Sequence, residues 1–212
     1  MKTSILKTTK LEHIDCISPG KKSACGIQVP KIRSPSKIMT LSRLGSSFPS
    51  RLRFMRILIR RLIQERPKLK ILSIDNYSSG LKKNHFKNKR LKYIRCDTKN
   101  ISKKLENFKS RIKAIFHFGE FARIYQSFLK MNECIDSNSI GSHAVFNFCM
   151  INNIKLIYSA TSATLGNNGN DKNLSPYAFT KSKNLELLNN LKKWFNFKFE
   201  IIYFYNVYGP KQ

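Results

Sequence analysis

Tyr177 and Lys181 are four residues apart in a segment that opens with Ser175 and Pro176, two residue types typical of a helix start. This spacing places both side chains on one face of a helix. A phenol beside an ammonium can exchange a proton near neutral pH, because the cation favours the phenolate. The hydroxyl of Thr161, at the end of the preceding apolar segment, could hold a substrate oxygen there. These residues predict an enzyme that deprotonates an alcohol during hydride transfer.

Short apolar segments alternate with helical patterns along most of the chain. Apolar runs at 69–75, 91–97, 114–119, 155–159 and 199–205 predict strands, and the patterns at 51–65, 131–152 and after Ser175 predict helices. Within the second helix we expect Ile135, Ile140, Val145 and Phe148 to face inward. Strands that alternate with helices predict parallel βαβ units, so the expected fold class is α/β with a doubly wound parallel sheet.

The chain has 212 residues and a formal net charge of +28. Residues 1–36 show no sustained periodicity, so we expect a basic mobile arm there and a single domain over 37–212. A basic chain can bind nucleic acid through its charge alone. No nucleic-acid-binding motif is present, so we expect no specific nucleic acid as partner. A nucleic-acid-associated protein stays an alternative that only the charge supports.

Five cysteines occur without a CxxC spacing and without a nearby histidine that would complete a metal site. We therefore expect no metal, and reduced thiols in a cytoplasmic protein. The longest apolar cluster, 54–63, contains three arginines and is too short to cross a bilayer. We expect no membrane span.

Seven motifs follow one another in the order of a known family. They are Ile74–Gly80, Cys96–Asp97, Phe116–Arg123, Asn138–Gly141, Tyr158–Ser162, Ser175–Lys181 and Asn206–Pro210. From about residue 70 onward the chain thereby resembles the extended short-chain dehydrogenase/reductase family, in particular its NAD-dependent nucleotide-sugar epimerases and dehydratases. The resemblance implies a Rossmann-like domain, NAD as cofactor, a nucleotide-sugar substrate and a homodimer.

On the cofactor side, the resemblance assigns Asp75 to the hydroxyls of the adenosine ribose, and Asp97 with Thr98 to the adenine. Phe118 and Gly119 match a turn that passes close to the ribose and the pyrophosphate. Two alternatives stay open. The first is that Asp75 is a turn-forming residue, and the second is that Asp97 caps a strand end.

On the catalytic side, the resemblance makes Tyr177 the acid/base and Thr161 the hydroxyl that binds substrate. Lys181 would bind ribose hydroxyls and favour the ionised form of Tyr177. Asn206 would contact the nucleotide-sugar, and Asn138 would brace the active-site backbone. The alternatives are a packing role for Tyr177 and a position on the helix surface for Asn138.

Three features depart from the family pattern. The glycine-rich GxxGxxG loop that lets backbone amides approach a pyrophosphate is missing. The first βα unit, with its strand at 37–41, is irregular and keeps only Gly45 before the helix. Glu120 stands where the family has a small residue, so we expect a carboxylate near the phosphates that weakens binding. The chain stops at Gln212, so we expect most of the substrate domain to be absent, as in a truncated or fragmentary gene product.

The expected function is that of an NAD-dependent nucleotide-sugar epimerase-like protein that oxidises a sugar hydroxyl through Tyr177. Ser162 and Ala163 follow Thr161, where the dehydratases of the family carry Asp-Glu, and this favours an epimerase. The alternative is a degenerate or truncated relative without turnover, acting as a binding module or a fragment.

Overall fold

A computed structural model describes residues 38–43, 49–78 and 85–204. Three predictions fall outside these ranges: the basic arm over 1–36, the loop that contains Gly45, and the substrate contact of Asn206. The remaining predicted elements and site residues lie within the part of the chain that the structure describes.

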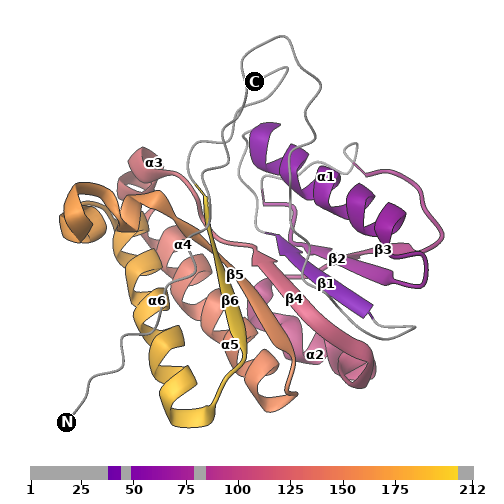
Figure 1. Ribbon diagram of the computed structural model, residues 1–212. Helices are drawn as coiled ribbons and strands as arrows, with labels where there is room; N and C mark the ends of the chain where they lie inside the picture. Colours follow the sequence, from indigo (N-terminus) through magenta and orange to yellow (C-terminus); the bar gives the residue numbers. More distant parts are fainter. Residues whose placement is uncertain (1–37, 44–48, 79–84, 205–212) are drawn as a thin grey trace. The chain divides into compact units, whose positions relative to one another are not determined.

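Six parallel strands form one sheet in the order β3-β2-β1-β4-β5-β6 (Figure 1). The strands are β1 (Ile38–Arg43), β2 (Lys70–Asp75), β3 (Leu91–Arg95), β4 (Ile112–Phe118), β5 (Lys155–Thr161) and β6 (Phe199–Phe204). The order reverses between β1 and β4, which creates the crevice where open α/β sheets bind ligands. The prediction of a Rossmann-like, doubly wound parallel sheet is confirmed.

Helices cover both faces of the sheet (Figure 1). Helix α1 (Pro49–Glu65) lies on one face, and α2 (Ile101–Leu105), α5 (Ser142–Ile151) and α6 (Pro176–Phe195) lie on the other. Two short helices, α3 (Ile124–Leu129) and α4 (Met131–Ile135), follow β4. No helix in the described ranges has the length and apolar character needed to span a membrane.

The start and end of α6 follow from its sequence. Ser175 caps the helix, since its Oγ accepts a hydrogen bond from the backbone N–H of Ala178, 3.0 Å away, and Pro176 follows it. The helix ends at Phe195, and its C-cap residue Asn196 takes the left-handed conformation with φ 52°. The predicted helix start is therefore confirmed, and it fixes the positions of Tyr177 and Lys181.

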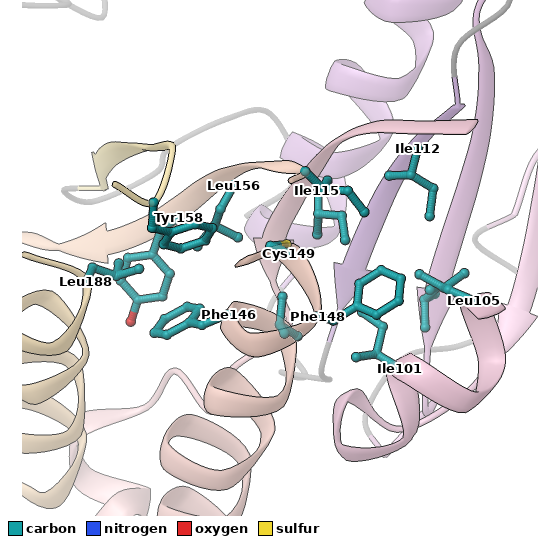
Figure 2. Close-up of a cluster of buried hydrophobic side chains, with 14 of the residues drawn as sticks. Ile101, Leu105, Ile112, Ile115, Phe146, Phe148, Cys149, Leu156, Tyr158 and Leu188 are labelled. Atoms are coloured by element: carbon teal, nitrogen blue, oxygen red, sulfur yellow. The ribbon is translucent and has the colours of Figure 1, made fainter. Parts of the chain in front are cut away.

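The hydrophobic core lies between the sheet and the helices α2, α5 and α6 (Figure 2). Its buried members come from the sheet and from these helices, among them Ile101, Leu105, Ile115, Phe146, Leu156, Tyr158 and Leu188. The ring of Phe146 meets that of Tyr158 edge-on, with centroids 5.5 Å apart. This core fixes β5 and α6 relative to each other, and thus the residues at their adjoining ends.

The predicted helix over 131–152 is interrupted by a π-helical segment, Asp136–Gly141, between α4 and α5. Ile135 and Ile140 were expected inside, but their exposed fractions are 41% and 55%. Val145 and Phe148 are buried as predicted. The wider π turn changes the phase of the helix, and polar Asn138 and small Gly141 face inward instead.

Candidate functional site

The carboxyl ends of the parallel strands bring the predicted site residues to one edge of the sheet. Asp75 ends β2, Phe118 ends β4, and Thr161 ends β5. The register of β1 places Asp75 and Phe118 opposite the same residue, Arg43. Helix α6 packs against β5 and the turn after it. We call residues 75–78 with 96–100 the β2–β3 edge, and residues 117–121, 158–162 and 177–184 the β4–β5 edge.

At the β2–β3 edge, carboxylates hold backbone turns. Oδ1 of Asp75 accepts a hydrogen bond from the N–H of Tyr77, 2.8 Å away, and Tyr77 has a φ of 59°. Oδ1 of Asp97 accepts from the N–H of Lys99, and its Oδ2 accepts from Nδ2 of Asn76, each at 3.0 Å. The turn and cap interpretations of Asp75 and Asp97 therefore describe the structure.

Thr98 is less suited to its expected role. Its side chain is 1% exposed, and its Oγ1 finds no hydrogen-bond partner among the described residues. A Cβ built at Gly141 would lie 2.3 Å from that Oγ1, so the two residues pack directly against each other. The hydroxyl of Thr98 therefore faces the π-helical segment, and any contact with an adenine would come from its backbone.

At the β4–β5 edge, Thr161 and Tyr177 are both buried, with exposed fractions of 7% and 3%. Oγ1 of Thr161 accepts a hydrogen bond from the N–H of Ala163 at 3.3 Å, at the start of the 3-10 turn Ser162–Thr164. The backbone N–H of Tyr177 donates to Oγ of Ser127 in α3, also at 3.3 Å. Local hydrogen bonds thus hold both backbones at adjoining ends of β5 and α6.

Phe118 and Gly119 form a tight turn after β4, in which the N–H of Glu120 donates to the carbonyl of Phe118 at 3.1 Å. This turn directs Glu120 into the protein, where its side chain is 0% exposed. The expectation that Glu120 would place a carboxylate near the phosphates is therefore wrong. Its side chain points away from the surface because the interior supplies enough hydrogen-bond donors to hold a charge.

Lys181 is the partner of Glu120. Its Nζ forms a buried ion pair with Oε2 of Glu120 and donates to the backbone carbonyl of Ser159. It also lies 4.7 Å from the centre of the Tyr158 ring. The residue expected to bind ribose hydroxyls is 1% exposed and is held inside the fold.

Three neutral donors complete the surroundings of Glu120. Its Oε1 accepts from Oγ of Ser142 at 2.7 Å, the hydroxyl of Tyr158 at 2.9 Å and Nδ2 of Asn184 at 2.9 Å. Ser142 is also 2.8 Å from Nε2 of His117. Since the hydroxyl of Ser142 has one proton and donates it to Glu120, Nε2 of His117 is the donor in that contact.

Burial alone would raise the pKa of Glu120, but the charge of Lys181 and the hydrogen bonds from Lys181 and Ser142 lower it below its ordinary value. Burial lowers the pKa of His117 to about 4, so its ring is neutral at pH 7. Burial, with the negative charge of Glu120, raises the pKa of Tyr158 well above 10, so its phenol stays protonated and donates. The network therefore has one anion, one cation and several neutral donors.

Asn138 joins this network from the π-helical segment and is 0% exposed, so the interpretation as a helix-surface residue is wrong. Its side chain bonds both the N–H and the carbonyl of Phe121, at 2.6 and 3.1 Å, and donates to Oγ1 of Thr180 at 3.1 Å. Its backbone carbonyl accepts from Asn184 at 2.6 Å. Asn138 thus connects the turn after β4 to α6.

Sequence reasoning missed Ser142, Tyr158 and Asn184 as partners of Glu120. One signal was available for Asn184, because it follows Lys181 by three residues and so lies on the same helix face. No such spacing marks Ser142 or Tyr158. Within the described ranges, no group of three or more His, Cys, Asp or Glu side chains has an arrangement that could hold a metal ion.

The residues present fit the expected dinucleotide at one edge and not at the other. At the β2–β3 edge, Asp75 and Asp97 lie at the ends of adjacent strands beside the switch point of the sheet. At the β4–β5 edge, the buried Glu120 already binds the ammonium that would hold the second ribose.

Comparisons with known proteins agree with this geometry. The model of the NAD dependent epimerase/dehydratase family matches residues 56–212. A search of curated proteins finds no match. Among solved structures, a UDP-N-acetylglucosamine 4-epimerase from Methanobrevibacter ruminantium is 25% identical, with a TM-score of 0.67, over 85% of this chain and 58% of the other.

Two further structures are similar in fold. A UDP-glucose 4-epimerase from Thermotoga maritima is 21% identical, with a TM-score of 0.67, over 82% of this chain and 57% of the other. A dTDP-glucose 4,6-dehydratase from Streptomyces venezuelae, crystallised with NAD, is 17% identical, with a TM-score of 0.70, over the same shares of the two chains. The chain therefore spans less than two thirds of the length of these structures.

Proposed function

The chain belongs to the NAD dependent epimerase/dehydratase family, and from that premise we propose that it is an NAD-binding, nucleotide-sugar epimerase-like protein. The observation that supports the proposal is that α6, which has Tyr177 in its first turn, packs against β5, which ends at Thr161, and against the turn after it. This packing supports a site in which a hydroxyl and a phenol act together at the carboxyl edge of a Rossmann-like sheet.

In this proposal Tyr177 removes the proton from a sugar hydroxyl, and Thr161 orients that hydroxyl by a hydrogen bond. Bound NAD would accept the hydride. Asp75 holds the adenosine ribose, while Asp97 and Asn76 shape the adjacent turn. Asn138 keeps the turn after β4 in place through its three hydrogen bonds to Phe121 and Thr180.

An epimerase is favoured over a dehydratase by the residues after Thr161. Ser162 and Ala163 form the start of the 3-10 turn there, so neither position supplies a carboxylic acid for an elimination step. The same strand end would serve an epimerase, which needs no further acid at that point.

A protein without turnover is the second candidate, and the ion pair of Lys181 with Glu120 favours it. A Lys181 that stays in the interior would not assist Tyr177. In that case residues 37–212 act as a binding module.

We further propose a homodimer and a cytoplasmic location. Several large apolar side chains of α3 and α4 are exposed, among them Tyr125 at 76% and Leu129 at 71%. A second copy would cover such a surface, as α3 and α4 adjoin α6. The described cysteines, Cys96, Cys134 and Cys149, are free thiols, which supports a reducing compartment.

The experiment that tests the function is an NAD titration of the full chain by calorimetry, followed by turnover assays with UDP-glucose and UDP-N-acetylglucosamine. We expect saturable NAD binding and slow epimerisation. Tyr177→Phe should lower kcat by about 10²- to 10⁴-fold and leave the Kd for NAD unchanged, because only the acid/base is lost. Binding without turnover in both proteins would favour the second candidate, and the absence of NAD binding would contradict the first.

A further inference from the structure

Every proton of the Lys181 ammonium has an acceptor inside the fold. The group donates to Oε2 of Glu120 and to the carbonyl of Ser159, and its third side faces the ring of Tyr158 at 4.7 Å. The side chain is 1% exposed. For Lys181 to reach a ligand at the edge of the sheet, at least one of these contacts must break.

The carboxylate of Glu120 is held more firmly than the ammonium. Its Oε1 accepts hydrogen bonds from three different elements: Ser142 in α5, Tyr158 in β5 and Asn184 in α6. None of these three bonds involves Lys181. Glu120 therefore stays in place if the lysine leaves, and the long, flexible side chain of Lys181 is the partner that can move.

We propose that Glu120 is a positioning residue that acts through Lys181: it is an internal counter-ion that competes with a dinucleotide for the lysine ammonium. The inference rests on the proposed function, since it concerns the affinity for NAD. It adds a residue that the family resemblance assigns to no such role. A dinucleotide that draws Lys181 to its ribose must leave a buried carboxylate without its cation, and this lowers the observed affinity.

The competition predicts that removal of the carboxylate tightens NAD binding. Glu120→Gln is the most informative change, because the Gln oxygen can still accept from Ser142, Tyr158 and Asn184. Its amide NH₂ would then face Lys181, and two donors cannot bond each other. The ammonium is thereby released toward the edge of the sheet. A residue that only supports the fold would weaken binding when replaced.

The test is a binding cycle on the full chain, with NAD titrated by calorimetry at pH 7. The proteins are the wild type, Glu120→Gln, Lys181→Met and the double variant, each checked for folding by circular dichroism. We expect Glu120→Gln to bind NAD about tenfold tighter or more, and Lys181→Met to change the wild-type Kd by less than about threefold. In the double variant the tighter NAD binding should disappear, because without Lys181 there is no ammonium that the loss of the carboxylate could release.

Two control variants separate the effect of the Glu120 charge from other effects of a substitution. Glu120→Ala removes the carboxylate without adding an amide and should also tighten binding, so the proposal stays testable if one variant fails to fold. Glu186→Gln breaks the exposed pair of Lys183 and Glu186 on the same helix and should leave the Kd unchanged.

Two results would overturn the competition alone: NAD binding that is unchanged or weaker in folded Glu120→Gln and Glu120→Ala, or an equal loss from Lys181→Met in the wild type and in Glu120→Gln. No NAD binding in any of the proteins would overturn the proposed function as well. The first two outcomes require measurable binding, so the two failures are distinguishable.

Discussion

The β2–β3 edge and the β4–β5 edge use their charged side chains in different ways. Asp75 and Asp97 accept hydrogen bonds from the turns at the ends of two strands. Glu120 and Lys181 neutralise each other in the interior. The comparison teaches that one sheet can use carboxylates at one edge to hold backbone turns and a buried carboxylate at the other to hold a cation inside the fold.

The most disruptive test of this contrast is Lys181→Met, which leaves Glu120 buried without its cation. We expect a loss of about 3–5 kcal/mol in the free energy of unfolding, measured by urea denaturation at pH 7. Lys183→Met breaks the exposed pair on the same helix and should leave the urea midpoint unchanged. Equal effects of the two changes would show that Lys181 has no buried partner.

The next test uses pH, because His117 adjoins the same network. Its pKa of about 4 in the folded chain lies below the ordinary 6.5, so the unfolded chain takes up a proton first as the pH falls. Stability should therefore decrease between pH 6.5 and 4, by about 3 kcal/mol in total. Urea midpoints across this window should fall less in His117→Asn, and as steeply as in the wild type in the exposed His143→Asn. An unchanged slope in His117→Asn would contradict the prediction.

A smaller effect is expected where the β2–β3 edge packs against the π-helical segment, at Thr98 and Gly141. A methyl group at position 141 would lie 2.3 Å from Oγ1 of Thr98, so Gly141→Ala should destabilise the chain by about 1–3 kcal/mol. Thr98→Ala removes the clashing atoms, and the double variant should recover most of that loss in thermal unfolding. Purely additive effects would show that the two residues do not touch.

The smallest effect concerns Asp75 and tests whether the edges act independently. Asp75→Asn keeps an acceptor for the N–H of Tyr77 but loses the charge, so NAD affinity should fall about tenfold with the fold intact. Calorimetry should give the same ratio in the wild type and in Glu120→Gln, because the substitutions lie in separate networks. A ratio that differs strongly between the two backgrounds would mean that the edges are coupled.

The sheet and its helices could be predicted because they depend on local patterns. Alternating apolar segments predicted the parallel strands, and Ser175 with Pro176 predicted the start of α6. Ile135 and Ile140 were misplaced because a π turn gives no signal in the apolar spacing. The positions of Asp75 and Asp97 could be predicted for a related reason, because parallel strands bring their carboxyl ends to one edge in any sheet of this class.

The Glu120 network could not be predicted, because it joins positions far apart in the sequence. Ser142, Tyr158 and Asn184 follow Glu120 by 22, 38 and 64 residues. Nothing in a single sequence shows that three donors converge on one carboxylate. Glu120 stood out in the sequence only as a departure from a family pattern. The direction of its side chain depends on the turn at Gly119, whose conformation the sequence leaves undetermined.

The most direct test of the buried pair is a proton–nitrogen NMR spectrum of the lysine ammonium groups at neutral pH. Exposed ammonium protons exchange quickly with water, whereas those of a buried, hydrogen-bonded group are protected. We predict one protected signal that is lost in Lys181→Met and is shifted or lost in Glu120→Gln. A spectrum without that signal, or a signal that Glu120→Gln leaves unchanged, would show that Glu120 does not hold Lys181.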